Sequence, residues 1–401
     1  MQKLSDRIIS IKPSATLAIT AKIKALRAQG IDVIGFGAGE PDFDTPEYIK
    51  NAAISSIKNG FTKYTPASGT LELKKAVCDK FRDDNGLHYT PEQVIVSCGA
   101  KHSLYNLIQV MCNPDDEVII PIPYWVSYPD MAKLADAKPV FSQGVEKNAF
   151  KIAPDELEKA ITKKTKILII NSPSNPCGTV YSRNELIEIA DIACKHDIYV
   201  ISDEIYEEII YDGLQHISIA SLNKDIKERT IVVNGVSKTY SMTGWRIGYA
   251  AGDADIIKAA GKLQSQSTSN PTSISQKAAL TAIQEKTNDV VKMVNEFGKR
   301  RDYIAERLND MDNVSCQKPK GAFYVFPNIS AYYGKEYNGN RINTDIDFCN
   351  FLLDVAKVGV IPGSAFGSPH HIRLSYATSM ENIKEGMNRM ESALKKLEVN
   401  K

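Results

Sequence analysis

Three polar residues follow short apolar, β-branched runs of the sequence and could act together: Lys238, Asp203 and Asn175. In an open sheet of parallel strands, ligands bind beyond the carboxyl ends of the strands, so these side chains are expected to meet. A lysine buried there favours its neutral amine, the form that Schiff-base chemistry uses. Taken singly, each residue also has a structural interpretation, as a solvent-facing lysine, a helix-capping acid and an Asn-Pro turn.

Together, a lysine, a carboxylate and an amide predict a site for pyridoxal phosphate. Lys238, the predicted catalytic residue, would hold the aldehyde of the cofactor as an imine. Asp203 would keep the pyridine nitrogen protonated, which makes the ring an electron sink. Asn175, helped by Tyr206, would hydrogen-bond to the phenolic oxygen of the ring.

The phosphate of such a cofactor needs an anion site, and two stretches offer one. An expected strand and an expected helix are joined by Gly99, Ala100 and Lys101, whose amides would form the anion site at that helix N-terminus. Ser237 and Arg246 stand on either side of the lysine and would add a hydroxyl group and a bidentate guanidinium. A glycine after a strand is weak support by itself, so the two stretches are needed together.

Two further residues are candidates for contacts with cofactor or substrate. Trp125, one of two tryptophans, follows an expected strand and would stack on the cofactor ring, although core packing explains it equally well. Arg373 lies within an apolar stretch, where an arginine is rarely buried without a partner. A substrate carboxylate suits its planar guanidinium, and a structural salt bridge is the alternative.

The elements that must position these residues form a regular alternation between residues 93 and 252. Short apolar runs alternate with amphipathic stretches, which predicts an α/β fold with a mostly parallel sheet between layers of helices. We expect strands at 94–96, 117–121, 166–171, 198–202 and 231–234. We expect helices at 15–29, 46–57, 100–112, 182–195 and 288–308, the fourth opened by the capping box Ser182-x-x-Glu185.

The C-terminal part has a different pattern. Strands at 322–326 and 371–376, a helix at 345–356 and a final helix capped by Thr378-x-x-Glu381 predict an α+β module. At 401 residues the chain is too long for one core. We therefore expect a large cofactor-binding domain at 46–290 and a smaller α+β domain built from both termini, 1–45 with its N-terminal arm and 291–401.

Composition excludes several classes of partner. Lys+Arg 49 against Asp+Glu 48 leaves a net charge of +1 without a basic stripe, which argues against nucleic acid. Seven scattered cysteines without a C-x-x-C pattern indicate free thiols in a reducing compartment and no metal site. No apolar run is long enough for a membrane span, and the start lacks a signal-peptide core, so we expect a cytoplasmic protein; an organelle form without its transit peptide has the same pattern.

The motifs resemble those of a known family. Ser-Lys-x-x-x-Met-x-Gly-Trp-Arg-x-Gly at 237–248 is similar to the pyridoxal phosphate attachment signature of class I aminotransferases. The stretches 171–178 and 202–206 and the Arg373 strand match other blocks of that family, in the family's order. Three stretches look like the bacterial and plastid aspartate aminotransferase branch, subgroup Ib: 38–43, 124–128 and 373–377. The resemblance covers essentially the whole chain.

The resemblance implies a fold type I enzyme that works as a homodimer with shared active sites. Tyr64 would reach the cofactor phosphate of the neighbouring subunit. Lys238 would also be the base that moves a proton between Cα of the substrate and C4′ of the cofactor. The residues implied to contact the amino-acid substrate are Gly39, Trp125, Asn175 and Arg373.

Recognition of the substrate side chain departs from the better-known animal and enteric branch. That branch carries an arginine upstream of a Ser-Asn-Pro, whereas here 264–268 contains none and the next arginine is Arg300. Subgroup Ib is thought to use a lysine at the position of Lys101, with hydroxyls such as Ser14 and Thr16 on the arm. Because a lysine is a point charge, we expect looser discrimination, with Lys12 as a second cation for prephenate.

The resulting expectation is transfer of the amino group between L-aspartate and 2-oxoglutarate by ping-pong chemistry. Two alternatives on the same scaffold stay open: an aminotransferase of broader specificity, for aromatic, alanine or prephenate keto acids, and a β-C–S lyase. A ligand-sensing regulator would need a DNA-binding module, and we expect no room for one because the family pattern starts within the first dozen residues.

Overall fold

The computed structural model describes residues 4–11, 15–144, 146–285 and 287–398. Its centre is a seven-stranded sheet in the order β2-β8-β7-β6-β5-β3-β4. Neighbouring strands are parallel except where β8 meets β2 and β7. The strands are β2 (Val94–Ser97), β3 (Glu117–Ile122), β4 (Lys138–Gln143), β5 (Thr165–Asn171), β6 (Tyr199–Asp203), β7 (Thr230–Gly235) and β8 (Gly248–Ala251).

Alternating strand residues pack against helices on both faces of this sheet. On β7, Ile231 and Val233 join one core and Val232 joins another, because successive side chains point to opposite faces. The first face is covered by α5 (Ala100–Met111), α6 (Tyr128–Leu134) and α10 (Ala254–Ser267). The other is covered by α3 (Glu47–Lys58), α4 (Leu71–Asn85), α7 (Pro154–Ala160), α8 (Arg183–Lys195), α9 (Lys224–Arg229) and α11 (Ser273–Gln284). The layers confirm the predicted α/β class with a mostly parallel sheet.

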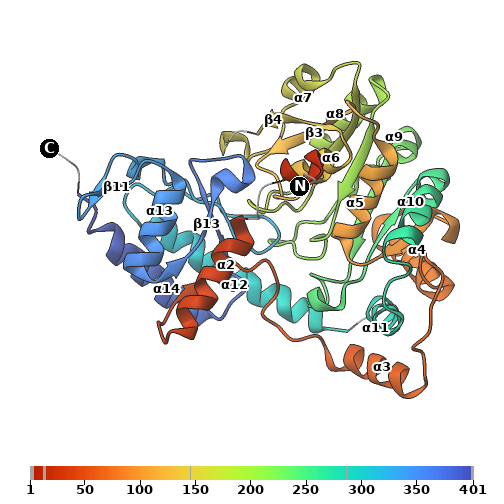
Figure 1. The fold of residues 1–401 in the computed structure, drawn as a ribbon, viewed down its shortest axis with the longest axis horizontal. Coiled ribbons are helices and arrows are strands. Elements are labelled where there is room, and N and C mark those ends of the chain that lie inside the picture. Colours follow the sequence, from red (N-terminus) through yellow and green to blue (C-terminus); the bar gives the residue numbers. More distant parts are fainter. Residues whose placement is uncertain (1–3, 12–14, 145, 286, 399–401) are drawn as a thin grey trace.

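The two ends of the chain meet beside the sheet. β1 (Ile34–Gly35) pairs in parallel with β12 (Val358–Gly359), and a second small sheet has the order β13-β14-β9. Figure 1 shows α2 in red against the blue C-terminal elements, with the long α12 running from them toward α11. The remaining bounds are α1 (Asp6–Ile9), α2 (Ala15–Ala28), α12 (Asp289–Asn309), α13 (Asp345–Phe351), α14 (Met380–Leu394), β9 (Tyr324–Val325), β10 (Glu336–Tyr337), β11 (Asn340–Arg341), β13 (Ile361–Pro362) and β14 (Ile372–Ser375).

Most predicted elements occur within one or two residues of their expected bounds, and two local predictions need correction. The capping box of Ser182 and Glu185 is present at α8. The predicted cap at Thr378 is wrong, because the Oγ of Ser379 accepts the Asn382 amide at 3.2 Å instead. The stretch 345–356 begins as an α-helix and ends in a π-helical turn. Among the described residues, no helix combines the length and apolar character needed to cross a bilayer.

Candidate active site

A cavity of about 710 Å³ opens above the carboxyl ends of β5, β6 and β7 and extends to β9 and β14. Its size falls within the range of roughly 300–1,000 Å³ that is usual for small-molecule sites. The residues that the sequence selected and that line it are Gly39, Ala100, Lys101, Trp125, Asn175, Asp203, Tyr206, Ser237, Lys238, Arg246 and Arg373. The fold thus brings together residues that are far apart in the sequence, the most distant being Gly39 and Arg373, 334 positions apart.

Lys238 follows β7, and its amine faces the cavity. The Nζ atom donates a hydrogen bond to the carbonyl of Gly39 at 2.6 Å. The pKa of this amine is lowered to about 8, chiefly because burial disfavours the ammonium; the charge of Glu40 opposes this, and those of Arg246 and Arg373 add to it. A neutral fraction of the amine is therefore available near neutral pH, which a nucleophile or a general base requires.

Asp203 is the last residue of β6 and is buried. Its Oδ2 accepts the Tyr128 hydroxyl at 2.7 Å, and its Oδ1 accepts the Ile205 amide at 3.3 Å. Burial raises the pKa of this carboxyl to about 6; the two hydrogen bonds and Lys238 oppose the rise, and Glu204 adds to it. A carboxylate held in this way is completed by a cationic ligand group, such as a protonated ring nitrogen.

Asn175 and Tyr206 also line the cavity, and both contact residues of the C-terminal strands: Asn175 contacts Arg373, and Tyr206 contacts Tyr324. The Asn175 amide donates to the Asn171 Oδ1 at 2.8 Å, which fixes the loop after β5. The hydroxyls of Tyr206 and Tyr324 lie 2.8 Å apart, so one donates to the other. Both tyrosines are buried, and burial raises their pKa values, which keeps them as neutral hydrogen-bonding groups.

Arg373, on β14, is buried, and among the described residues no carboxylate forms an ion pair with it. Its Nη1 donates to the Asn175 Oδ1 at 3.0 Å and its Nη2 to the Gly37 carbonyl at 2.8 Å, while Nε has no partner. The rings of Tyr324 and Phe366 flank the guanidinium at 4.6 and 5.1 Å. A structural salt bridge is therefore not what holds this arginine, and a buried cation with an unused donor is suited to an anionic ligand.

At the start of α5, where an anion site was predicted, the Arg246 guanidinium packs against Gly99. Gly99 adopts φ +91°, and a Cβ there would lie 2.4 Å from Nη2 of Arg246, so a side chain would collide with the guanidinium. Arg246 itself is fixed by donation to the Thr243 carbonyl at 2.8 Å and the Cys98 carbonyl at 3.1 Å. With the buried Ser237 on the same cavity, the helix N-terminus, a hydroxyl and a guanidinium converge.

Lys101 lies at the rim of this site. Its Nζ is 4.9 Å from the centre of the Trp125 ring, a cation–π distance. Burial, and then the charge of Arg246, lowers the pKa of its amine. Trp125 packs edge-on against Tyr128, the residue that holds Asp203, with ring centres 5.2 Å apart. The rim lysine is thus connected to the floor of the cavity through two aromatic rings.

Four other predicted residues are not among those that line the cavity, and for three of them the side chain is outside the described part of the molecule. The side chain of Tyr64 is 90% exposed and does not line the cavity. Ser14 and Lys12 lie outside the described residues. Thr16 is in the first turn of α2, and its side chain also lies outside the described part of the molecule.

The sequence analysis did not predict two residues that contact the site. Tyr128 opens α6 and bonds to Asp203, and Tyr324, on β9, bonds to Tyr206. Both belong to stretches that the sequence analysis identified, but nothing local separates a tyrosine that faces a ligand from one that packs in a core. Only the pairing of β9 with β14 brings Tyr324 beside Arg373.

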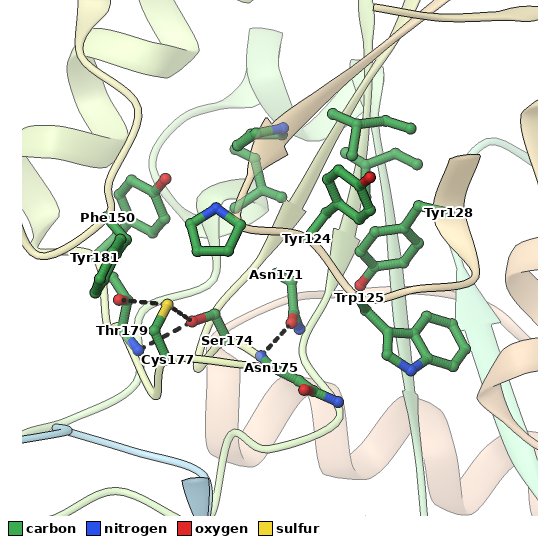
Figure 2. Close-up of a pocket in the computed structure, with 15 residues that line it drawn as sticks. Tyr124, Trp125, Tyr128, Phe150, Asn171, Ser174, Asn175, Cys177, Thr179 and Tyr181 are labelled. Carbon is green, nitrogen blue, oxygen red and sulfur yellow. Dashed lines mark hydrogen bonds between the residues drawn. The ribbon is translucent and has the colours of Figure 1, made fainter. Parts of the chain in front are cut away.

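Figure 2 shows a smaller cavity, of about 30 Å³, next to the large one. Trp125, Asn171 and Asn175 line both. At its other side the Sγ of Cys177 lies 3.1 Å from the Ser174 hydroxyl and 3.2 Å from that of Thr179. Burial raises the pKa of this thiol, which disfavours the thiolate form that a nucleophile requires. This space is large enough for about one water molecule behind the Asn175 loop.

Comparison with known proteins gives consistent matches. The family model described as aminotransferase class I and II matches residues 31–390. The chain is 51% identical to an aspartate aminotransferase of Bacillus subtilis, over 98% of this chain and 99% of that protein. It is 48% identical to an aspartate/prephenate aminotransferase of Nitrosomonas europaea, over 98% and 100%. Among solved structures, the aspartate aminotransferase from Rhizobium meliloti superposes with a TM-score of 0.96 at 44% identity, over 99% of this chain and 100% of that one.

Proposed function

Because the chain belongs to the class I and II aminotransferase family, we propose that it is an aspartate aminotransferase that uses pyridoxal phosphate to exchange an amino group between L-aspartate and 2-oxoglutarate. The observation that carries the proposal is the arrangement of Lys238, Asp203 and Arg373 around one cavity. The identity of 51% to an aspartate aminotransferase supports the choice of substrate.

The residues of the cavity fit this cofactor. The absence of a side chain at Gly99 lets the Arg246 guanidinium lie against the start of α5, and this guanidinium and Ser237 suit the phosphate. Asp203, whose pKa burial raises, suits a protonated ring nitrogen, and Lys238, whose pKa burial lowers, suits the aldehyde. When bound, the cofactor supplies an electron sink for the charge that develops at Cα of the substrate.

The chain's own residues then bind the substrate and move one proton. Arg373 receives the α-carboxylate through the donor that has no protein partner, and Asn175 fixes the guanidinium plane. Lys238 would take the proton from Cα and return it to C4′ of the cofactor, because an amine with a pKa of about 8 both accepts and releases a proton near neutral pH.

The side-chain carboxylate of aspartate is assigned to Lys101, with Ser14 and Thr16 of the arm as hydroxyl donors. Lys101 stands over Trp125 at the rim and forms no ion pair with the described residues. The solved structure of the aspartate aminotransferase from Thermus thermophilus with maleate, a dicarboxylate, superposes with a TM-score of 0.91 at 42% identity. A single ammonium supplies charge without a fixed geometry, which favours dicarboxylates without excluding other substrates.

The larger organisation is proposed on the same basis. Residues 46–290 form the cofactor domain, and residues 1–45 with 291–401 form the small domain. A homodimer in the cytoplasm, with Tyr64 reaching the cofactor phosphate of the partner subunit, agrees with the exposure of Tyr64 and of Ile54 and Ile57 on α3. The partners are small amino acids and 2-oxo acids.

A steady-state assay of the purified protein with pyridoxal phosphate tests the proposal. With aspartate and 2-oxoglutarate, we expect oxaloacetate and glutamate in equal amounts. Double-reciprocal plots at several fixed concentrations of the second substrate should give parallel lines, as a ping-pong route requires. Incubation with cystathionine should release no pyruvate, and pyruvate without oxaloacetate would replace this function by a β-C–S lyase.

Prephenate is a second candidate substrate. Relatives at 48% and 47% identity, from Nitrosomonas europaea and Cereibacter sphaeroides, are named aspartate/prephenate aminotransferases. The rim supports this reading because Lys101 is a point charge over an aromatic ring rather than a bidentate clamp. Turnover of prephenate with aspartate as donor, compared with that of 2-oxoglutarate, decides it; no product from prephenate restricts the enzyme to small dicarboxylates.

A further inference from the structure

The loop from Tyr64 to Thr70 has no regular secondary structure, yet it begins with a side chain that is 90% exposed. Such a loop exposes its backbone groups and needs partners elsewhere to hold one conformation. Two backbone bonds help, from the Val96 amide to the Ser68 carbonyl and from the Gly69 amide to the Pro66 carbonyl, both at 2.9 Å. Further contacts come from two glutamines of other elements.

Gln276, on α11, is fully buried and spends its amide on this loop. Its Oε1 accepts the Thr70 amide at 2.9 Å, and its Nε2 donates to the Thr65 hydroxyl at 2.9 Å and to the Pro271 carbonyl at 2.8 Å. One side chain thereby holds both ends of the segment that follows Tyr64. A buried amide with every polar atom engaged fixes a unique geometry.

Gln264, on α10, is also fully buried and joins the loop to the large sheet. Its Nε2 donates to the Ala67 carbonyl at 2.6 Å and to the Val96 carbonyl at 2.8 Å, while its Oε1 accepts from the Asn106 side chain at 3.0 Å. Val96 belongs to β2, the strand that leads to Gly99 and the anion site of the same subunit. One amide therefore contacts both the Tyr64 loop and the strand before the phosphate cradle.

We propose that Gln276 and Gln264 are positioning residues for the cofactor: they clamp the loop 64–70 so that Tyr64 is presented to the cofactor phosphate of the partner subunit. This inference rests on the proposed function, from which the homodimer and pyridoxal phosphate are taken. It assigns a role to the stretch 264–268, which lacks the substrate-binding arginine of the other branch. In this chain the stretch supplies a loop clamp.

The test is a double-mutant cycle on the binding of pyridoxal phosphate to the apoenzyme, followed by quenching of tryptophan fluorescence. Gln276→Met keeps the side-chain volume and removes the clamp, and Tyr64→Phe removes the phosphate contact. We expect each change alone to raise the Kd about tenfold, the effect of one charge-assisted hydrogen bond. In the Tyr64→Phe background, Gln276→Met should change the Kd less than about twofold, because the contact that it positions is already absent.

Two further readouts separate positioning from a merely structural role. Pyridoxal, which lacks the phosphate, should bind Gln276→Met and wild type alike. In the apoenzyme, hydrogen exchange of the peptide 62–70 should rise in Gln276→Met and not in Gln284→Met, an exposed glutamine at the end of the same helix. Thr65→Val, which removes the bond from the loop side without touching the core, should behave as Gln276→Met does and serves if that variant does not fold.

The inference is overturned if Gln276→Met or Thr65→Val leaves the Kd unchanged. It is also overturned if the variant weakens pyridoxal as much as pyridoxal phosphate, or keeps its full effect without the Tyr64 hydroxyl. These binding measurements need no substrate. A wild-type protein that binds pyridoxal phosphate but gives no oxaloacetate from aspartate would contradict the proposed function and leave the clamp standing.

Discussion

Within the segment 203–207, four polar residues divide between two buried regions with opposite character. Asp203 and Tyr206 line the cavity. Glu204 and Glu207 enter a closed network in which every carboxylate oxygen has a partner. Those partners are Ser202, Ser218 and His216 for Glu204, and Lys80, Asn85 and Asn234 for Glu207.

The difference lies in whether the buried carboxylate has an ion-pair partner among the described residues, and not in residue type or burial. Burial raises the pKa of Asp203 to about 6 because the hydrogen bonds from Tyr128 and Ile205 and the charge of Lys238 offset only part of the effect of burial. Burial acts on Glu207 in the same direction, but the charge of Lys80 outweighs it and the pKa is lowered. Potential ligand atoms of Glu204, Glu207 and His216 lie within 4.8 Å of one another, yet Lys80 already supplies the cation there. A buried carboxylate without an ion-pair partner among the described residues, and not a cluster of charge, therefore marks the region that we propose does the chemistry.

The largest expected effect on this comparison comes from the cavity lysine. Lys238→Ala should lower turnover of aspartate by more than about 10⁴-fold, since it removes both the covalent anchor and the base. The visible absorbance of the attached cofactor should be lost while the unfolding midpoint stays near that of wild type. Lys166→Ala, at the opposite end of a strand of the same sheet, is the control and should retain activity. Retained steady-state transamination in Lys238→Ala would contradict the assignment of the catalytic residue.

The closed network should respond in the opposite way. Lys80→Met leaves the buried Glu207 carboxylate without its cation, so the free energy of unfolding in urea should fall by about 3–5 kcal/mol. The kcat of the protein that remains folded should change less than about twofold. Lys50→Met, which removes an exposed lysine with two carboxylate partners at 2.8 Å, should have far less effect on stability. A large loss of kcat in Lys80→Met would mean that the two regions are not independent.

The pH dependence of stability should have opposite signs in the two regions. In the apoenzyme the folded state raises the pKa of Asp203 from 3.8 to about 6, so folding favours its protonated form. Stability is therefore lost as pH rises from about 4 to about 6, by about 3 kcal/mol at most, because one pKa unit corresponds to about 1.4 kcal/mol. Apo Asp203→Asn should be more stable than wild type at pH 8, with the difference shrinking toward pH 4.

The matched variant in the closed network reverses this result. The pKa of Glu207 is lowered on folding, so its contribution is present above the unfolded pKa and is lost as pH falls. Glu207→Gln should therefore be less stable than wild type at pH 8. Urea unfolding of both apo variants between pH 4.5 and 8 measures the two slopes. If the two variants changed the pH dependence of the free energy of unfolding with the same sign, the distinction between the Asp203 and Glu207 carboxylates would be wrong.

The sequence predicted this site because its main determinants are local. A β-branched run followed by a polar residue gives a strand with a side chain at its carboxyl end, and parallel topology brings such ends together, as at Asn175, Asp203 and Lys238. The period of two along a strand also separates Asp203 from Glu204. The sequence does not say which neighbour saturates a carboxylate, since Lys80 and Tyr128 come from other elements.

The features that the sequence analysis did not predict also depend on contacts between elements or on the local backbone conformation. The strand β4 (138–143) was missed because its side chains are mostly half-buried or exposed, so its pattern is weak. β8 is an apolar run like the others, and only its neighbours decide that it is antiparallel. At α14 two hydroxyl residues are adjacent, and the extended backbone of Ser379 at φ −61° and ψ 153° selects it over Thr378.

The smallest effect on activity is expected from Lys101 at the rim of the cavity, which, like Arg373, forms no ion pair with the described residues. Arg373 is fixed by two carbonyl-type acceptors, whereas the Lys101 amine is held only over the Trp125 ring. Because a lysine ammonium is a point charge without the fixed geometry of a guanidinium, it gains less from a carboxylate. Lys101→Ala should therefore raise the KM for aspartate and 2-oxoglutarate by a factor that corresponds to about 1–3 kcal/mol of lost binding free energy. An aromatic partner should be affected less, since it has no second carboxylate for Lys101 to bind. Steady-state kinetics with both partners measures the ratio, and Lys159→Ala is the control, because Lys159 is paired with Glu156 at 2.7 Å and does not line the cavity. Equal losses for both partners would mean that Lys101 serves the cofactor phosphate through its neighbour Arg246, and the choice of substrate would then have to come from the arm.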